Sequence, residues 1–153
     1  NTNTNTNGRG IQIYGAVVEL EDIAVFGCSY SGISVEHIKA GASKLIATRC
    51  EISNNGQSGL SIYNINNNTS QNVCLKNCIS HNNHDCGIFM CGKGVVNIHG
   101  DSTAIHTNAR YGIYAMRSCK VLIHLPSHHN TFYNNTREDR VTMNGGTITN
   151  VED

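Results

Sequence analysis

A short phrase that returns five times along the chain constrains the fold more than any other feature. Each copy is a glycine followed by two apolar residues with one residue between them. The copies are Gly10-Ile11-Gln12-Ile13, Gly32-Ile33-Ser34-Val35, Gly59-Leu60-Ser61-Ile62, Gly87-Ile88-Phe89-Met90 and Gly112-Ile113-Tyr114-Ala115, at spacings of 22, 27, 28 and 25 residues. A repeat of this length is typical of a solenoid, in which each repeat buries its apolar face against its neighbours.

Each repeat also contains two further pairs of apolar residues before the glycine, such as Val73 with Leu75 and Ile23 with Val25. These pairs alternate with a period of two, which is the side-chain period of a β-strand. The sequence therefore predicts an all-β fold, a parallel β-helix of about six coils with three short strands per coil. We expect one domain over residues 1–153, with Val141 and Met143 as the next inward pair after the glycine phrases and a further strand from Gly146.

Asparagine recurs four and five residues before the glycine. The slot reads Asn54-Asn55, Asn82-Asn83 and Thr107-Asn108 in successive repeats, and Asn135 fits it again later. Asparagine tolerates the left-handed backbone that a tight bend needs. Because strands of neighbouring coils lie about 4.8 Å apart, we expect the asparagine side chains to form an internal hydrogen-bonded ladder.

The repeat, with its Gly-Ile/Leu-x-Ile/Val phrase and its asparagine turn, resembles the right-handed parallel β-helix repeat of the pectin-lyase-like superfamily. The segment 121–131, with Tyr133-Asn134-Asn135 and Gly145-Gly146-Thr147-Ile148, is similar to β-helix proteins predicted from algae and other protists. The resemblance covers essentially the whole chain and implies a right-handed solenoid. It implies no single activity, because the superfamily contains lyases, hydrolases, epimerases, adhesins and phage tailspikes.

The composition narrows the classes of partner. The chain has 11 basic and 11 acidic residues and a formal net charge of zero, which with no basic run disfavours nucleic acid and anionic membranes. Its apolar stretches are only a few residues long, so we expect no membrane span. Acceptor patterns for N-glycosylation at Asn67, Asn68 and Asn134 favour an extracellular or cell-surface location.

The acidic residues do not gather in a catalytic pattern. The resemblance implies that polysaccharide hydrolases and lyases on this fold use clustered Asp, or Asp and Arg around calcium, on one outer face, because both groups must reach one bond. Asp85 stands two residues before its glycine, where the neighbouring repeats have no acid. If the chain is an enzyme, we expect Asp85, Arg110, His81 and His106 to carry its chemistry.

Histidine and cysteine residues provide the remaining candidates. His81 and His106 both stand six residues before a glycine, so we expect them on adjacent coils, with His84 in the turn beside them. Imidazoles at such a spacing can share a transition metal, but the pattern favours a surface histidine ladder without metal, and we expect no cofactor. Cys50 and Cys78 share one slot on adjacent coils, where a disulfide and a reduced, packed pair both fit.

Two functions remain open at this point. The first is a non-catalytic extracellular module, structural or adhesive, that contacts glycans and is a segment of a longer chain or assembly. The sequence indicates no helix or charged cap at either end, and an uncapped β-helix exposes a strand edge, so copies of itself or further β-helix chain are expected to stack end to end into a filament. The alternative is a polysaccharide-active enzyme (a lyase, hydrolase or epimerase) with its site on the outer face and the variable loops.

Overall fold

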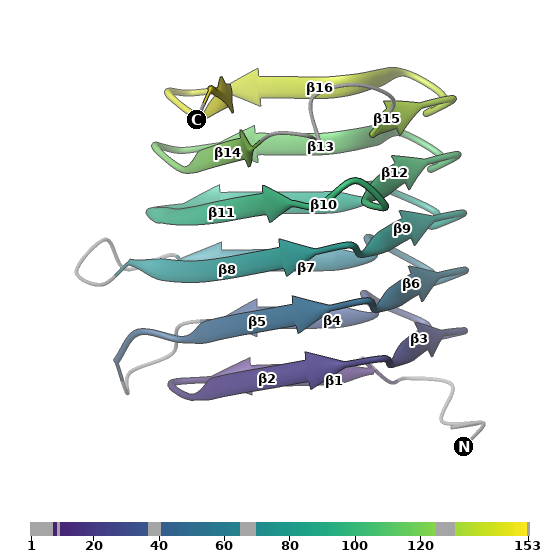
Figure 1. Cartoon of the computed structure of the whole chain (residues 1–153), viewed down its shortest axis with the longest axis horizontal. Helices are drawn as coiled ribbons and strands as arrows, with labels where there is room; N and C mark the ends of the chain where they lie inside the picture. The colour runs from purple at the N-terminus through teal and green to yellow at the C-terminus, as the bar shows by residue number, and fades with distance from the viewer. Residues whose placement is uncertain (1–7, 9, 37–40, 65–69, 125–130, 153) are drawn as a thin grey trace.

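The computed structural model describes residues 8, 10–36, 41–64, 70–124 and 131–152 and shows a stack of parallel β coils (Figure 1). Sheet A contains β1 (Ile11–Tyr14), β4 (Ile33–Glu36), β7 (Leu60–Asn64), β10 (Ile88–Gly92), β13 (Tyr111–Met116) and β16 (Glu138–Met143). Sheet B contains β2 (Val17–Glu21), β5 (Lys44–Thr48), β8 (Gln71–Lys76), β11 (Gly94–His99), β14 (Lys120–His124) and β17 (Thr147–Val151). Sheet C contains β3 (Ala24–Phe26), β6 (Glu51–Ser53), β9 (Ile79–His81), β12 (Ala104–His106) and β15 (Phe132–Tyr133).

The chain visits sheets A, B and C in turn, so each coil adds one strand to each sheet. The prediction of an all-β parallel β-helix with three strands per coil is therefore confirmed. Within the described residues, sheets A and B have six strands each and sheet C has five, against the prediction of about six coils. No helix in this part of the chain has the length and hydropathy of a membrane-spanning segment.

The glycine phrases stack in register. In sheet A the first apolar residue of each phrase aligns from coil to coil, and all but Ile11 are fully buried; the row is Ile11, Ile33, Leu60, Ile88 and Ile113. Full burial of each such aliphatic side chain contributes about 1.5–3 kcal/mol. The core is thus a set of aliphatic rows that run along the axis of the solenoid.

The glycine itself is required by the close packing of neighbouring coils. A Cβ atom built on Gly87 would lie 2.4 Å from Ile105 Cγ2 and 2.9 Å from the carbonyl oxygen of Gly112. Both neighbours belong to the packed interior of the next coil, so neither can move away easily. This contact explains why glycine returns with every repeat.

The predicted asparagine ladder is present. Each side-chain Nδ2 donates to the Oδ1 of the next asparagine: Asn55 to Asn83 at 3.0 Å, Asn83 to Asn108 at 3.0 Å and Asn108 to Asn135 at 2.9 Å. Beyond it, Asn135 Nδ2 donates to Asp139 Oδ1 at 2.7 Å. The ladder therefore satisfies a line of buried polar groups through successive coils.

The residues before the ladder adopt the left-handed backbone that the turn was expected to need. Their φ angles are 54° at Asn54, 53° at Asn82, 55° at Thr107 and 55° at Asn134. At the first coil, Cys28 takes the place of an asparagine, and its backbone N–H donates to Asn55 Oδ1 at 3.1 Å.

The expected inward pair Val141 and Met143 is wrong. In β16, Arg140 pairs with the buried Ile113 and Thr142 pairs with the buried Ala115, so Val141 and Met143 face outward. Arg140 is only partly buried and Thr142 is exposed, so both polar side chains reach solvent from these inward positions.

Arg140 is held in this position by two contacts. Its Cζ lies 4.4 Å from the centre of the Phe132 ring, and its Nη1 donates to Asn150 Oδ1 at 2.9 Å. Asn150 itself pairs with the buried Ile123, so both polar residues stand at inward positions. The sequence did not lead us to expect a charged residue at an inward position of β16, and we call this arrangement of β16 and β17 the Arg140–Asn150 cap.

Candidate functional site

The outer face of sheet A carries four neighbouring aromatic residues. Phe89 and Tyr114 align on β10 and β13, and Tyr63 and Tyr111 flank them. The ring centres lie 5.2 Å apart for Tyr63 and Phe89, 5.6 Å for Phe89 and Tyr114, and 5.3 Å for Tyr111 and Tyr114. We call these four residues the sheet A aromatic row.

The rings of this row are inclined to one another, at 50° for Tyr63 and Phe89 and 71° for Phe89 and Tyr114. Inclined rings do not cover each other's faces as parallel stacked rings do. An aromatic face carries partial negative charge, so it attracts the weakly positive C–H groups of a sugar ring. Tyr63 is 38% exposed, whereas Phe89, Tyr111 and Tyr114 are partly buried, so the row offers one exposed aromatic ring and three partly covered ones.

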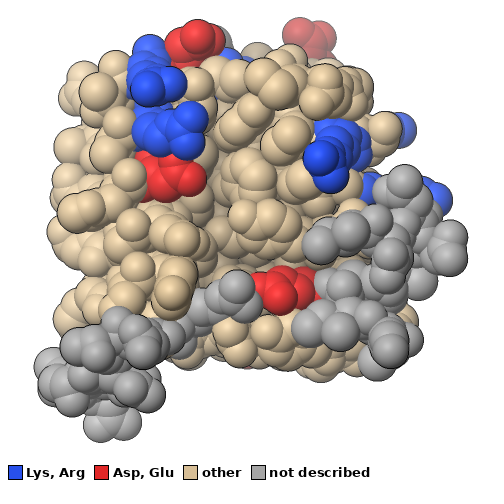
Figure 2. All heavy atoms as spheres, turned by 180° about the vertical axis from the view of Figure 1, so that it is seen from behind, with Lys and Arg blue, Asp and Glu red and all other residues tan. Residues whose placement is uncertain are grey.

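Charged groups lie beside this row rather than within it. Figure 2 shows the molecule from the side of sheet A, with a broad area of uncharged residues and a few separate groups of charged atoms around it. At the turn between sheets C and A, Arg110 Nη1 lies 3.2 Å from Asp85 Oδ1. The guanidinium carbons of Arg110 and Arg137 lie 5.3 Å and 6.0 Å from the centre of the Tyr111 ring. Hydrogen-bond donors thus stand next to the aromatic surface.

Asp85 is engaged as a structural ion-pair partner. Besides Arg110, its Oδ2 accepts a long hydrogen bond from Ser58 Oγ at 3.5 Å. In the part of the chain that the structure describes, no hydrogen bond or ion pair joins Asp85 or Arg110 to His81 or His106. The four residues proposed for catalysis from the sequence thus form two contacting pairs, Asp85 with Arg110 and His81 with His106.

His81 and His106 stack on the outer face of sheet C, with ring centres 5.0 Å apart and planes 10° apart. Tyr133 continues the stack on His106 at 4.6 Å and 5°. His81 Nε2 lies 3.0 Å from Glu51 Oε1 and its Nδ1 lies 2.8 Å from Asn82 Nδ2, so both nitrogens are occupied. Because the rings of His81 and His106 are parallel, their nitrogen lone pairs do not converge on one point.

The histidines proposed as metal ligands lie at or near the surface. Among the described residues, no three His, Cys, Asp or Glu side chains are grouped to hold a metal ion. His84 is exposed in the turn, and its backbone N–H donates to the carbonyl of Asn55 at 3.0 Å. Of the weak metal candidates, His81 and His106 thus form a stacked pair, and His84 is exposed in the turn; their use as metal ligands stays a hypothesis.

Two pKa shifts follow from this histidine ladder. The hydrogen bond from His81 lowers the pKa of Glu51 despite partial desolvation of its carboxylate. Burial, followed by the charge of His81, lowers the pKa of His106. Protonation of His106 is therefore disfavoured in the folded protein.

Cys50 and Cys78 are both buried free thiols in the structure. Cys78 Sγ donates to the carbonyl of Ala47 at 3.3 Å, and Cys50 Sγ donates to the carbonyl of Thr48 at 3.4 Å. Burial raises the pKa of Cys78 to about 11, so its nucleophilic thiolate is scarce near neutral pH. The structure thus contains the reduced, packed form of the pair.

The glycosylation acceptors are only partly described. Asn67 and Asn68 lie outside the described residues, whereas Asn134 is exposed in the turn between β15 and β16. Its position leaves the side chain accessible, and its use as an acceptor stays a prediction.

Sequence reasoning did not single out the aromatic row, although a signal was present. The middle residues of the glycine phrases form one column of sheet A, and they read Gln12, Ser34, Ser61, Phe89 and Tyr114 in order; Ser34 and Ser61 are buried. The last two of these are aromatic and adjacent in the sheet. Comparison of that column across repeats would have indicated the sheet A aromatic row.

The model of the protein family described as the right-handed beta helix region matches residues 1–136 of this chain. The chain therefore belongs to this family, and the right-handed parallel β-helix implied by the resemblance is confirmed. A comparison with curated proteins found no match, and neither did a comparison with solved structures. Family membership establishes the fold, and the function has to be argued from the surface of this chain.

Proposed function

We propose that this protein is a non-catalytic β-helical module of the cell surface or extracellular space that contacts glycans. The observation that carries the proposal is the sheet A aromatic row, in which Tyr63, Phe89, Tyr111 and Tyr114 present inclined rings along the solenoid axis. A rigid stack of coils holds these rings at fixed spacing. Binding therefore requires little ordering of the protein, which reduces its entropic cost.

The proposal is non-catalytic because the candidate catalytic groups have structural partners. Asp85 pairs with Arg110, and His81 is bonded to Glu51 and Asn82. A polysaccharide hydrolase needs two carboxyl groups that flank one bond, and Asp85 has no acidic partner among the contacts of the described residues. The exposed acceptor pattern at Asn134 supports the extracellular part of the proposal.

Assembly into a larger stack is proposed through the first coil. Its inward residues Val18 and Leu20 are only partly buried, although they pack against the core. A coil added there, from a copy of this protein or from further β-helix chain, would cover an apolar row and pair with a strand edge. The Arg140–Asn150 cap makes the last coil a poorer partner, because stacking on it would bury a charge.

Affinity electrophoresis of the full chain through gels that contain soluble neutral or acidic polysaccharides tests glycan binding. Tyr63→Ala should weaken binding roughly three- to tenfold, which corresponds to the contribution of one aromatic contact. Tyr133→Ala is the matched control, because Tyr133 is 39% exposed but lies in the sheet C stack.

Retention by none of the polysaccharides, or equal losses in the two variants, would contradict the proposal. The same mixtures are assayed for newly formed reducing ends and unsaturated products. Cleavage that disappears in Asp85→Asn would establish the enzymatic alternative instead.

A further inference from the structure

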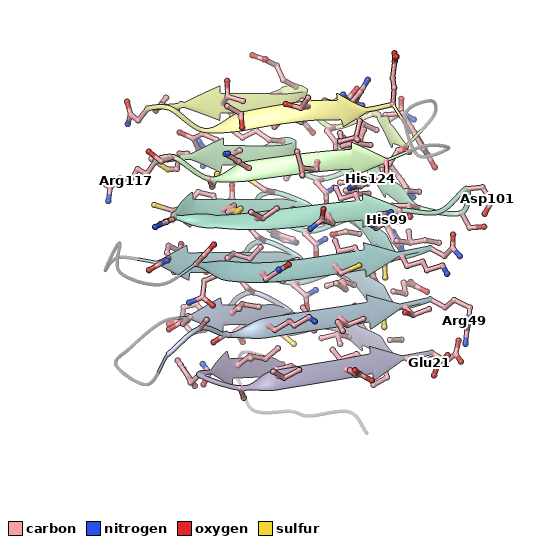
Figure 3. All side chains as sticks on the ribbon, turned by 60° about the vertical axis from the view of Figure 1, so that its left-hand side comes forward. Glu21, Arg49, His99, Asp101, Arg117 and His124 are labelled. Atoms are coloured by element: carbon pink, nitrogen blue, oxygen red, sulfur yellow. The ribbon has the colours of Figure 1, made fainter. Side chains whose placement is uncertain are left out.

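Positive charges without an acidic partner gather at the corner where sheet A leads into sheet B. In the described part of the chain, the ion pairs involve Arg49, His81 and Arg110, and none involves Lys93, Arg117 or Lys120. Figure 3 shows Arg117 projecting from this corner, whereas Arg49 lies beside Glu21 at the opposite end of sheet B. The net charge of this corner is therefore not neutralised by neighbouring side chains.

A pocket that is open to solvent lies at this corner, and we call it the corner cavity. It has a volume of about 260 Å³ and is lined by Ser70, Lys93, Gly94, Val95, Ser118 and Lys120. These residues come from three successive coils, at the starts of β8, β11 and β14. Pockets that enclose a whole small molecule typically measure roughly 300–1,000 Å³, so this corner cavity is suited to a single chemical group of a ligand.

The backbone that carries these side chains is fixed by its neighbours. The carbonyl of Lys93 accepts a hydrogen bond from Asn64 Nδ2 at 2.6 Å. A Cβ atom on Gly94 would lie 2.7 Å from Met90 Cε and 2.8 Å from the carbonyl oxygen of Gln71, so the chain packs closely at this point. Lys120 pairs with Val95 in the strand register. The packed core therefore fixes the backbone around the corner cavity before any ligand binds.

The donors around the cavity define its chemistry. The ammonium groups of Lys93 and Lys120 carry three donors each and no acceptor, and the hydroxyl groups of Ser70 and Ser118 can donate as well. No hydrogen bond to another described residue engages any of these four side chains. Ammonium and hydroxyl donors together suit a compact oxyanion, because charge-assisted hydrogen bonds to its oxygens are strong.

We propose that the corner cavity binds a sulfate or phosphate group. The proposal goes beyond glycan contact and stands without it, because the cavity is at the start of sheet B and the aromatic row is on the outer face of sheet A. The group has two possible sources, a free inorganic anion or an ester carried by a larger molecule. Both present the same tetrahedral arrangement of oxygens.

The test is an NMR titration of the full chain with sodium sulfate and with sodium phosphate, at constant ionic strength maintained with sodium chloride. The backbone amide signals of Gly94 and Ser118 should shift and saturate. Lys93→Gln and Lys120→Gln should each weaken binding by about tenfold, because each removes one charged donor. Lys76→Gln is the matched control: Lys76 ends β8 in the same sheet and does not line the cavity.

A sulfate ester of a simple sugar, compared with inorganic sulfate, distinguishes the two sources. Tighter binding of the ester identifies a larger carrier, and equal binding identifies the free anion; either result supports the oxyanion site. The proposal is overturned if chloride alone reproduces the shifts, if the shifts do not saturate, or if both lysine variants bind like the unmodified protein. Tyr63→Ala should leave the sulfate titration unchanged, which separates this site from the glycan proposal.

Discussion

Replacement of Asn83 by alanine should remove a large part of the stability of this protein. The Asn83 side chain lies in the middle of the ladder and is 1% exposed. Its Oδ1 accepts from the Asn55 backbone N–H at 3.2 Å and from Asn55 Nδ2 at 3.0 Å. Its Nδ2 donates to the carbonyl of Ile52 at 3.2 Å and to Asn108 Oδ1 at 3.0 Å.

The expected magnitude follows from the groups left behind. In Asn83→Ala, the buried Asn55 N–H loses its acceptor, and the Asn55 Nδ2 and the Ile52 carbonyl each lose one hydrogen bond inside the stack. A buried donor left without an acceptor costs about 1–3 kcal/mol and each further lost hydrogen bond about 0.5–1.5 kcal/mol, so the loss is about 2–6 kcal/mol. Single domains have unfolding free energies of roughly 5–15 kcal/mol, so the variant should be close to unfolding.

Urea unfolding followed by circular dichroism measures this loss. Asn54→Ala is the matched control, because Asn54 is the exposed neighbour with a φ of 54° and lies outside the ladder. It should cost about 1 kcal/mol, the price of a left-handed alanine. Equal losses of stability in the two variants would refute this reasoning. The turn conformation, and not the ladder, would then explain why asparagine recurs at this position of the repeat.

Two further predictions concern the histidine ladder and the first coil. Because the folded state lowers the pKa of His106 from 6.5, the unfolded chain binds the proton more readily, and stability should fall as pH drops below about 6.5. His106→Gln should flatten this dependence in thermal melts, and an unchanged slope would contradict it; the lowered pKa of Glu51 acts separately, below its ordinary value of 4.5. Leu20→Lys should abolish concentration-dependent association in sedimentation experiments, whereas Val17→Lys, which adds the same charge at a position 68% exposed, should not. A monomer at all concentrations before mutation would remove the assembly proposal, and melts of both variants check that they fold.

The features predicted correctly from the sequence are those that every coil needs for its own geometry. Gly87 has no room for a Cβ atom, and Asn82 has a left-handed backbone. Such requirements act locally and repeat with the coil, so they appear in the sequence as a spacing. The inward rows follow from them, because alternation then assigns each neighbouring residue to one face.

The last coil shows where this reasoning fails. Residues 138–143 read Glu-Asp-Arg-Val-Thr-Met, and alternation alone permits Val141 inward or Arg140 inward. The pairing of β13 with β16 decides the phase, and Asn150, ten residues away in the chain, provides the hydrogen bond that makes an inward Arg140 acceptable. Alternation of apolar and polar residues does not reveal the contact between Arg140 and Asn150, because only the folded chain brings these residues together.

The candidate sites were less accessible to sequence reasoning than the fold. The sequence shows that Phe89 and Tyr114 occupy the same position of two successive repeats, but it does not show the angle between their rings. The corner cavity joins Ser70, Lys93 and Ser118 from three coils whose connecting segments differ in length. Its lining becomes apparent only when the strands are stacked in register.

The asparagine ladder gives the interior of the protein an electrical direction. Every rung from Asn55 to Asn108 donates from Nδ2 toward the next coil, so the amide dipoles align head to tail. Hydrogen bonds in such a chain polarise one another, and the positive ends of the dipoles all point toward β16. The final acceptor there is the carboxylate of Asp139, a negative group at the positive end of the array, as an acidic residue is at the start of an α-helix.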